Sequence, residues 1–110
     1  MKRILIMSVA LVSSFLINTP LFAHHGTAIS YDQDKEITLK GTVTQFVWSN
    51  PHAHILFDIK DETGTTVHWA AEGSSPSNWA RSGWSRSTLK AGDQITISMH
   101  PSKAGTNVGV

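Results

Sequence analysis

The chain has 110 residues and no cysteine, and its nine Lys and Arg side chains nearly balance its eight Asp and Glu side chains. The absence of cysteine excludes both a disulfide and a lipid-modified cysteine anchor. The formal net charge of +1 is far from the strongly basic balance of a typical nucleic-acid-binding domain, so we expect no nucleic-acid partner.

The first 23 residues have the pattern of a secretory signal peptide. Lys2 and Arg3 precede the apolar run ILIMSVALVSSFLI, and the small residue Ala23 suits the cleavage site. Polar residues interrupt the run, which disfavours a stable membrane span. We therefore expect a periplasmic protein that starts at His24 and keeps no stable membrane anchor after cleavage. The alternative is an uncleaved anchor.

Residues 24–110 keep all six histidines of the chain. Loss of Lys2 and Arg3 leaves seven basic against eight acidic side chains, so the net charge becomes −1. A chain of this length forms one small domain with a modest core. Because histidine is unusually frequent in it, histidine marks the candidate functional positions.

We expect an N-terminal arm at residues 24–35 and one β domain at residues 36–110. Four segments have the alternation and β-branched composition of strands: 36–49, 52–60, 66–73 and 94–100. Gly41 is the expected bend in the long first strand. Ser75 and Pro76 predict the start of a short helix near residues 76–82.

This order of elements predicts an all-β fold. It is that of a small OB-like, partly open antiparallel barrel with one short helix between strands 3 and 4 that plugs one end. Only the residues from Val108 to Val110 remain for a fifth strand. Either the barrel is open, or the chain is truncated before its last strand; we favour the second, since an open edge is an aggregation hazard.

Alternation along the strands predicts which side chains face the core. In the second strand the histidines fall on the outer side, opposite in phase to Ile55 and Phe57. The predicted buried set is Val43, Val47, Ile55, Phe57, Val67, Trp69, Ile95 and Ile97. A one-residue slip of register would expose core residues, so such slips are disfavoured.

A hairpin loop at residues 61–65 would place His54 opposite Glu72, and Asp58 opposite His68. A turn at Asn50-Pro51 would place His54 opposite Phe46, and His52 opposite Trp48. The second register turns the polar Gln45 inward, so we expect a β-bulge near Gln45.

These registers predict one outer patch of histidine, acidic and aromatic side chains: Phe46, Trp48, His52, His54, Asp58, His68 and Glu72. The corresponding face of many OB-type domains binds ligands. One hypothesis is therefore a binding module for a small molecule, a glycan or a periplasmic protein. The alternative is a half-solvated face that merely tolerates histidine. Trp69, Trp79 and Trp84 are expected in the core or the plug.

A second hypothesis is metal binding, with copper ahead of zinc. A free amine at His24 offers an amine and an imidazole to one metal ion, to be completed by another histidine. Alternatively, His25 binds Cu(II) with the amine and the intervening amide nitrogen, since nitrogen-rich tetragonal sites favour Cu(II). The candidate ligands are His24, His25, His52, His54 and His100.

We do not expect an enzyme. The sequence has no cysteine nucleophile, no nucleophile-elbow motif and no metalloprotease spacing. The acidic pairs Asp32/Asp34 and Asp61/Glu62 fall in arm or loop positions, where solvated charges are usual.

Four stretches of the chain, AHHGTAISYD, LKGTVTQFVWSNPHAHI, VHWAAEG and GWSRSTLKAGDQITI, resemble the small secreted bacterial family named domain of unknown function 6152. The resemblance covers most of residues 24–110. It implies a periplasmic, β-barrel-like domain and implies no activity. Members of this family usually continue past a Pro-x-Lys-x-Gly turn into another strand, which again indicates a truncated chain.

Overall fold

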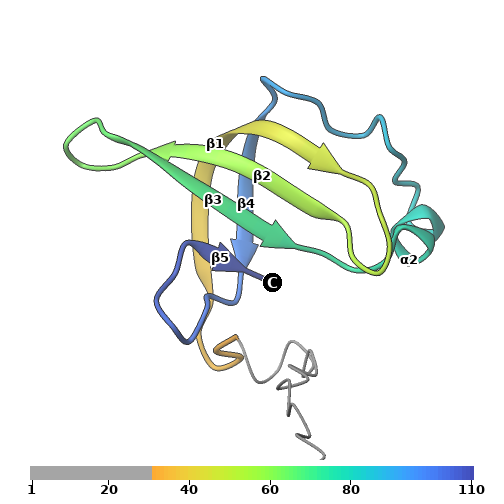
Figure 1. Cartoon of the computed structure of the whole chain (residues 1–110), viewed down its shortest axis with the longest axis horizontal. Helices are drawn as coiled ribbons and strands as arrows, with labels where there is room; N and C mark the ends of the chain where they lie inside the picture. The colour runs from red at the N-terminus through yellow and green to blue at the C-terminus, as the bar shows by residue number, and fades with distance from the viewer. Residues whose placement is uncertain (1–30) are drawn as a thin grey trace, which may run out of the picture.

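The structure, a computed structural model, describes residues 31–110. The predicted signal peptide, His24 and His25 lie outside the described residues. The described part is mostly strands, with one short helix (Figure 1). In chain order the elements are β1 (Ile37–Val47), β2 (His54–Lys60), β3 (Thr66–Glu72), α2 (Pro76–Arg81), β4 (Gln94–Met99) and β5 (Val108–Gly109).

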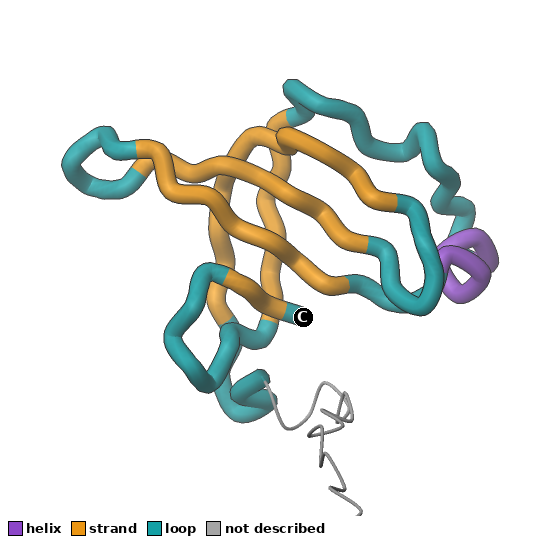
Figure 2. Tube along the Cα trace, viewed as in Figure 1, coloured by secondary structure: helices purple, strands orange, loops and turns teal. Residues whose placement is uncertain are grey.

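The strands form one curled sheet in the order β4-β1-β2-β3-β5, a partly open half-barrel (Figure 2). This confirms the predicted OB-like fold class, with its short helix between β3 and β4. Within residues 31–110, no helix is both long and apolar enough to cross a membrane.

The long strand β1 belongs to both halves of the sheet. Its residues Ile37 to Thr42 pair with β4, and its residues Thr42 to Val47 pair with β2. Where the pairing changes, a β-carbon placed on Gly41 would lie 2.5 Å from the carbonyl oxygen of Asp58. Only glycine allows the two backbones to approach so closely, so the bend predicted at Gly41 has a steric cause.

The β2–β3 hairpin has the predicted register, with His54 opposite Glu72 and Asp58 opposite His68. The Asp61 carboxylate fixes its loop by accepting hydrogen bonds from the Thr63 hydroxyl and from the N–H groups of Thr63 and Thr65. These hydrogen bonds lower the pKa of Asp61, and the bond from the Thr63 hydroxyl has the largest effect.

The β1–β2 register contains the predicted bulge, between Val43 and Gln45. The bulge shifts the pairing by one residue, so Phe46 lies opposite Ile55, and Val47 lies opposite His54. The prediction that His54 faces Phe46 was therefore wrong. Phe46 packs against the core, because the extra residue reverses the alternation beyond it.

The core consists of buried apolar side chains from four strands: Val43, Ile55, Phe57, Ala71 and Met99. The other residues of the predicted buried set are half-buried: Val47, Val67, Trp69, Ile95 and Ile97. Val47 moves to the outer side with the bulge. The β4 residues remain half-buried because β4 is the last strand on its side of the sheet.

The last residues form the short strand β5, which pairs in parallel with Ala70 and Ala71 of β3. Just beyond β4, His100 exchanges two backbone hydrogen bonds with Val110, of 2.7 and 3.0 Å. β5 therefore joins β3 to the end of β4, and the rest of the gap between these strands stays open. The expected truncation remains a prediction.

Helix α2 lies at the end of the barrel beside the β1–β2 turn (Figure 1). Ser75 is its N-cap residue, and the Ser75 hydroxyl accepts a hydrogen bond from the N–H of Asn78. The Trp79 ring lies against Gly73, where a β-carbon would collide with it. This contact attaches the six-residue helix to the end of β3.

We expect Gly41→Ala to lower the free energy of unfolding by about 1–3 kcal/mol, because the added methyl group must displace the backbone of β2. Urea unfolding followed by circular dichroism measures the change. The exposed neighbour Lys40 provides the matched control Lys40→Ala, with an expected change within about 0.5 kcal/mol. Equal midpoints for Gly41→Ala and the parent protein would contradict the steric role of Gly41.

Candidate functional site

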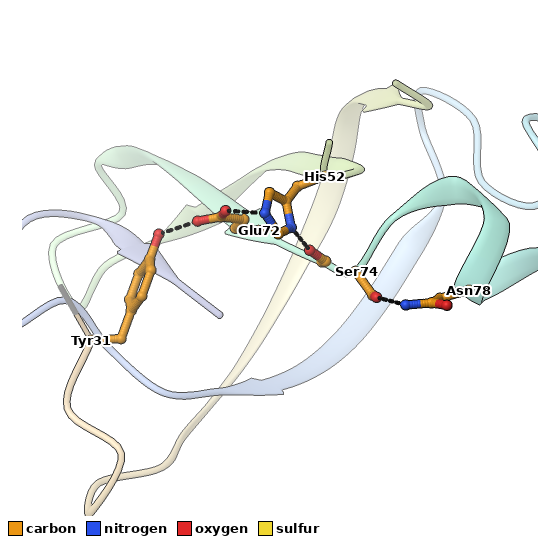
Figure 3. Close-up of polar contacts among 6 residues, drawn as sticks. Tyr31, His52, Glu72, Ser74 and Asn78 are labelled. Carbon is orange, nitrogen blue, oxygen red and sulfur yellow. Dashed lines mark hydrogen bonds and ion pairs between the residues drawn. The ribbon is translucent and has the colours of Figure 1, made fainter. Parts of the chain in front are cut away.

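Three polar side chains meet at the end of β3, and we call Tyr31, His52 and Glu72 the Glu72 cluster (Figure 3). The Tyr31 hydroxyl donates a 2.8 Å hydrogen bond to Oε2 of Glu72. The Nε2 atom of His52 lies 3.7 Å from Oε1 of the same carboxylate. The Glu72 side chain is only 21% exposed, so its carboxylate is largely enclosed by these neighbours.

His52 is held in one orientation by the backbone of β3's end. Its Nδ1 atom lies 2.9 Å from the carbonyl oxygen of Gly73. Because a carbonyl oxygen can only accept, Nδ1 carries the proton and donates it. The Nε2 atom is left facing Glu72, and in the neutral imidazole its lone pair is available to a ligand.

Tyr31 joins the N-terminal segment to this site. It forms an isolated β-bridge with Ser102, and the residue is 8% exposed. Burial, together with the hydrogen bond to the Glu72 carboxylate and its charge, raises the pKa of Tyr31 to about 12. The sequence predicted only an N-terminal arm at residues 24–35, without this contact. The one signal was that this segment contains the only tyrosine of the chain.

Four aromatic rings cluster beside the Glu72 cluster, at the end of the barrel closed by α2. The ring centroids of Trp79 and Trp84 are 4.8 Å apart, and that of Phe46 lies 5.6 Å from Trp48 and 6.2 Å from Trp79. Phe46 and Trp48 therefore belong to the aromatic plug, which we define as Phe46, Trp48, Trp79 and Trp84.

A cavity of about 360 Å³ opens between the aromatic plug, β3 and β4. Its lining is mainly apolar and comes from both sides of the gap in the barrel: Ile55, Ala71, Glu72, Gly73, Trp79, Trp84, Leu89, Ile95, Thr96, Ile97 and Ser98. Glu72 is the one ionisable residue of this lining. Glu72 thus belongs both to the lining of the cavity and to the Glu72 cluster.

The structure divides the outer patch predicted from the sequence. His52 and His54 do lie beside Glu72, from the turn before β2 and from β2 itself. Asp58 and His68 form a separate pair further along the same two strands, with a 2.5 Å contact and a His68 side chain that is 84% exposed.

His100, the fifth candidate metal ligand, is separated from β3 by the β5 segment, so among the described residues it does not join His52 and His54 beside Glu72. His100 pairs with Val110, and the β5 segment that ends in Val110 pairs on its other side with β3. The Nδ1 atom of His100 donates to the carbonyl oxygen of Lys35 at 2.7 Å. Among residues 31–110, no three His, Asp or Glu side chains are grouped closely enough to hold a metal ion.

This arrangement can bind a ligand with two kinds of surface. The cavity offers apolar and aromatic contact, and the Glu72 carboxylate offers a hydrogen-bond acceptor with negative charge. Small-molecule sites commonly combine an apolar lining with a few placed polar groups. The geometry therefore points to binding as the chemistry of this site.

Comparison with known proteins gives one family match. The model described as "Family of unknown function (DUF6152)" matches residues 11–110. No curated protein and no solved structure matches the chain.

We expect the absorbance of tyrosinate to appear with a midpoint near pH 12. Because the pKa of Tyr31 is raised by folding, its contribution to stability is complete below about pH 10, the unfolded value, and is lost between pH 10 and 12. Glu72→Gln should lower the midpoint by removing the charge. Asp58→Asn removes a carboxylate elsewhere and should leave the midpoint unchanged. A midpoint near pH 10 in the parent protein would contradict the Tyr31–Glu72 contact.

Proposed function

The chain belongs to the family of unknown function DUF6152, and from the geometry of its own site we propose that it is a periplasmic binding protein. Its ligand has an apolar body and a positively charged or hydrogen-bond-donating group. The body enters the cavity between β3 and β4, and the polar group meets Glu72. The signal-peptide pattern of the first 23 residues supports export to the periplasm.

The observation that carries this proposal is a mainly apolar cavity whose lining includes one ionisable residue, Glu72. Its volume of about 360 Å³ lies in the range of small-molecule sites. Trp79 and Trp84 provide large, flat contact surfaces. The enclosed charge of Glu72 favours a donor or a cation over an anion of the same shape.

We expect the neutral fluorescent probe N-phenyl-1-naphthylamine to bind in this cavity and brighten. Ala71 lines the cavity, so Ala71→Leu should fill part of the space and weaken probe binding about tenfold or more. Ala91 is exposed in a turn, and Ala91→Leu should leave binding unchanged. Circular dichroism verifies that both variants fold. Binding of the probe that is equal in both variants would contradict the cavity as the site.

A second candidate function, the binding of copper or zinc, is favoured by the orientation of His52. Histidines that bind metals usually donate their other ring N–H to a carbonyl or carboxylate. His52 donates in this way to Gly73, with its Nε2 atom beside Glu72. His54 lies opposite Glu72 on the next strand. At most two ligands would thus come from this side of the barrel, because no three such side chains are grouped closely enough among residues 31–110.

The remaining ligands would come from His24 or His25. His24 lies seven residues before Tyr31, whose hydroxyl contacts Glu72. A segment of this length spans up to about 23 Å when extended, so the chain can reach the site. The amine and imidazole of His24, or the amine with His25, would complete a nitrogen-rich set that favours Cu(II).

We expect protein recovered from the periplasm to have the mass of residues 24–110 and to bind Cu(II) more tightly than protein with one extra residue before His24. The extra residue displaces the amine. His52→Ala and either His24→Ala or His25→Ala should also weaken binding, and affinity should fall as the imidazoles become protonated at lower pH. Calorimetry measures affinity, and electron paramagnetic resonance reports the nitrogen ligands. His68→Ala is the control. Equal, weak affinity of both N-terminal forms would contradict the metal proposal.

A further inference from the structure

The connection from α2 to β4 carries positive charge without nearby negative charge to compensate it. Residues 73–92 contain Arg81, Arg86 and Lys90 but no Asp or Glu. Lys90 lies 3.4 Å from Asp93, so its charge is compensated locally. Arg81 and Arg86 are exposed, and neither forms an ion pair within residues 31–110. Two uncompensated cations therefore lie close together on this connection.

The backbone of this connection is folded into successive tight turns. The carbonyl oxygen of Trp79 accepts hydrogen bonds from the N–H groups of Ser82 and Trp84, at 2.9 and 3.1 Å. The N–H of Thr88 donates to the carbonyl oxygen of Ser85 at 3.0 Å, and the Thr88 hydroxyl accepts from the N–H of Ser85 at 2.8 Å. Because Trp79 and Trp84 belong to the aromatic plug, these turns keep both arginines at its end of the barrel.

Several carboxylates lie away from this end. Asp61 and Glu62 belong to the exposed β2–β3 loop, and Asp34 and Glu36 are exposed just before β1. Figure 1 shows the β2–β3 loop at the left, α2 at the right and the segment before β1 at the bottom. The charge of the molecule is therefore asymmetric. An anionic surface would attract the α2 end and repel the β2–β3 loop, which orients the approach.

Tryptophan accompanies the two arginines. Three of the four tryptophans of the chain, Trp48, Trp79 and Trp84, belong to the aromatic plug. All three are half-buried, so part of each residue stays accessible. An indole combines a large apolar ring with one N–H donor, and it favours the boundary between a membrane and water. Cations alone suit any polyanion, whereas cations beside partly accessible indoles suit the headgroup region of a membrane.

We propose that the α2 end of the barrel is a peripheral docking surface for a membrane that contains anionic phospholipids. Arg81 and Arg86 pair with lipid phosphates, which the planar guanidinium group fits well. The half-buried indoles enter the headgroup region. So few cations give weak, reversible and salt-sensitive binding, unlike an anchor. Neither arginine belongs to the lining of the cavity, so this surface is independent of the proposed ligand-binding function.

Binding of protein recovered from the periplasm to lipid vesicles tests this surface. At low salt and about 1 mM lipid, a concentration suited to weak association, we expect sedimentation with vesicles of phosphatidylglycerol and phosphatidylcholine but not with phosphatidylcholine alone. Tryptophan emission should shift to shorter wavelength as the indoles leave water. The double variant Arg81→Gln/Arg86→Gln should bind about tenfold more weakly or worse, because each basic side chain near an anionic surface contributes roughly a fivefold factor.

The matched control is Lys40→Gln/Lys60→Gln, which removes the same charge from exposed positions outside the α2 end. Its binding should stay within about threefold of the parent protein, since charges beyond the Debye length are screened. Circular dichroism verifies the fold of both variants.

Equal weakening of the two double variants would overturn the α2 end as the docking surface and leave net charge as the cause. Equal binding to both kinds of vesicle, or to neither, would overturn docking on anionic lipid. Binding to dextran sulfate without binding to vesicles would assign the arginines to a soluble polyanion instead. Binding of N-phenyl-1-naphthylamine in the absence of lipid should be the same in the parent protein and in Arg81→Gln/Arg86→Gln, so a failure of the cavity function would be seen separately.

Discussion

The close crossing of β1 over β2 at Gly41 is the contact on which the rest of the sheet depends. One strand serves as neighbour to β4 and to β2, and it can do so only if it bends where the pairing changes. The absent side chain at Gly41 lets the backbone come within reach of the Asp58 carbonyl. The bend brings β4 round towards β3, but these two strands do not pair. The partly open barrel and its cavity therefore follow from the close approach of Gly41 to Asp58.

Glu72 connects three parts of the molecule that are distant in the sequence. It accepts a hydrogen bond from Tyr31 of the N-terminal segment, lies beside His52 of the β1–β2 turn, and borders the cavity that α2 and β4 complete. From His52 the contacts continue through Gly73 to Ser74, whose hydroxyl accepts a 2.9 Å hydrogen bond from Asn78 of α2 (Figure 3). A ligand that draws on the Glu72 carboxylate therefore competes with the contacts that attach both the N-terminal segment and His52.

The sequence was informative where structure is local. Alternation and a short loop sufficed to place His54 opposite Glu72, because a two-residue period fixes the face and the loop fixes the register. The bulge was foreseen from the misplaced Gln45, yet its effect on Phe46 was not, since one extra residue reverses every side chain beyond it. The Tyr31–Glu72 bond joins residues 41 positions apart, and β5 has two residues; neither has a periodic pattern that a single sequence could reveal.

The aromatic plug gives this end of the barrel an intrinsic spectroscopic signal. Indole rings whose centroids are 4.8 Å apart, as in Trp79 and Trp84, couple their electronic transitions, and the sign of the resulting signal depends on their mutual tilt, here 49°. The same two rings line the cavity, and Trp79 also lies against Gly73. The near-ultraviolet spectrum is thus an intrinsic record of the geometry around the gap, with no added label. A change in what fills that gap would alter the relative orientation of the two indole rings, and with it their circular dichroism signal.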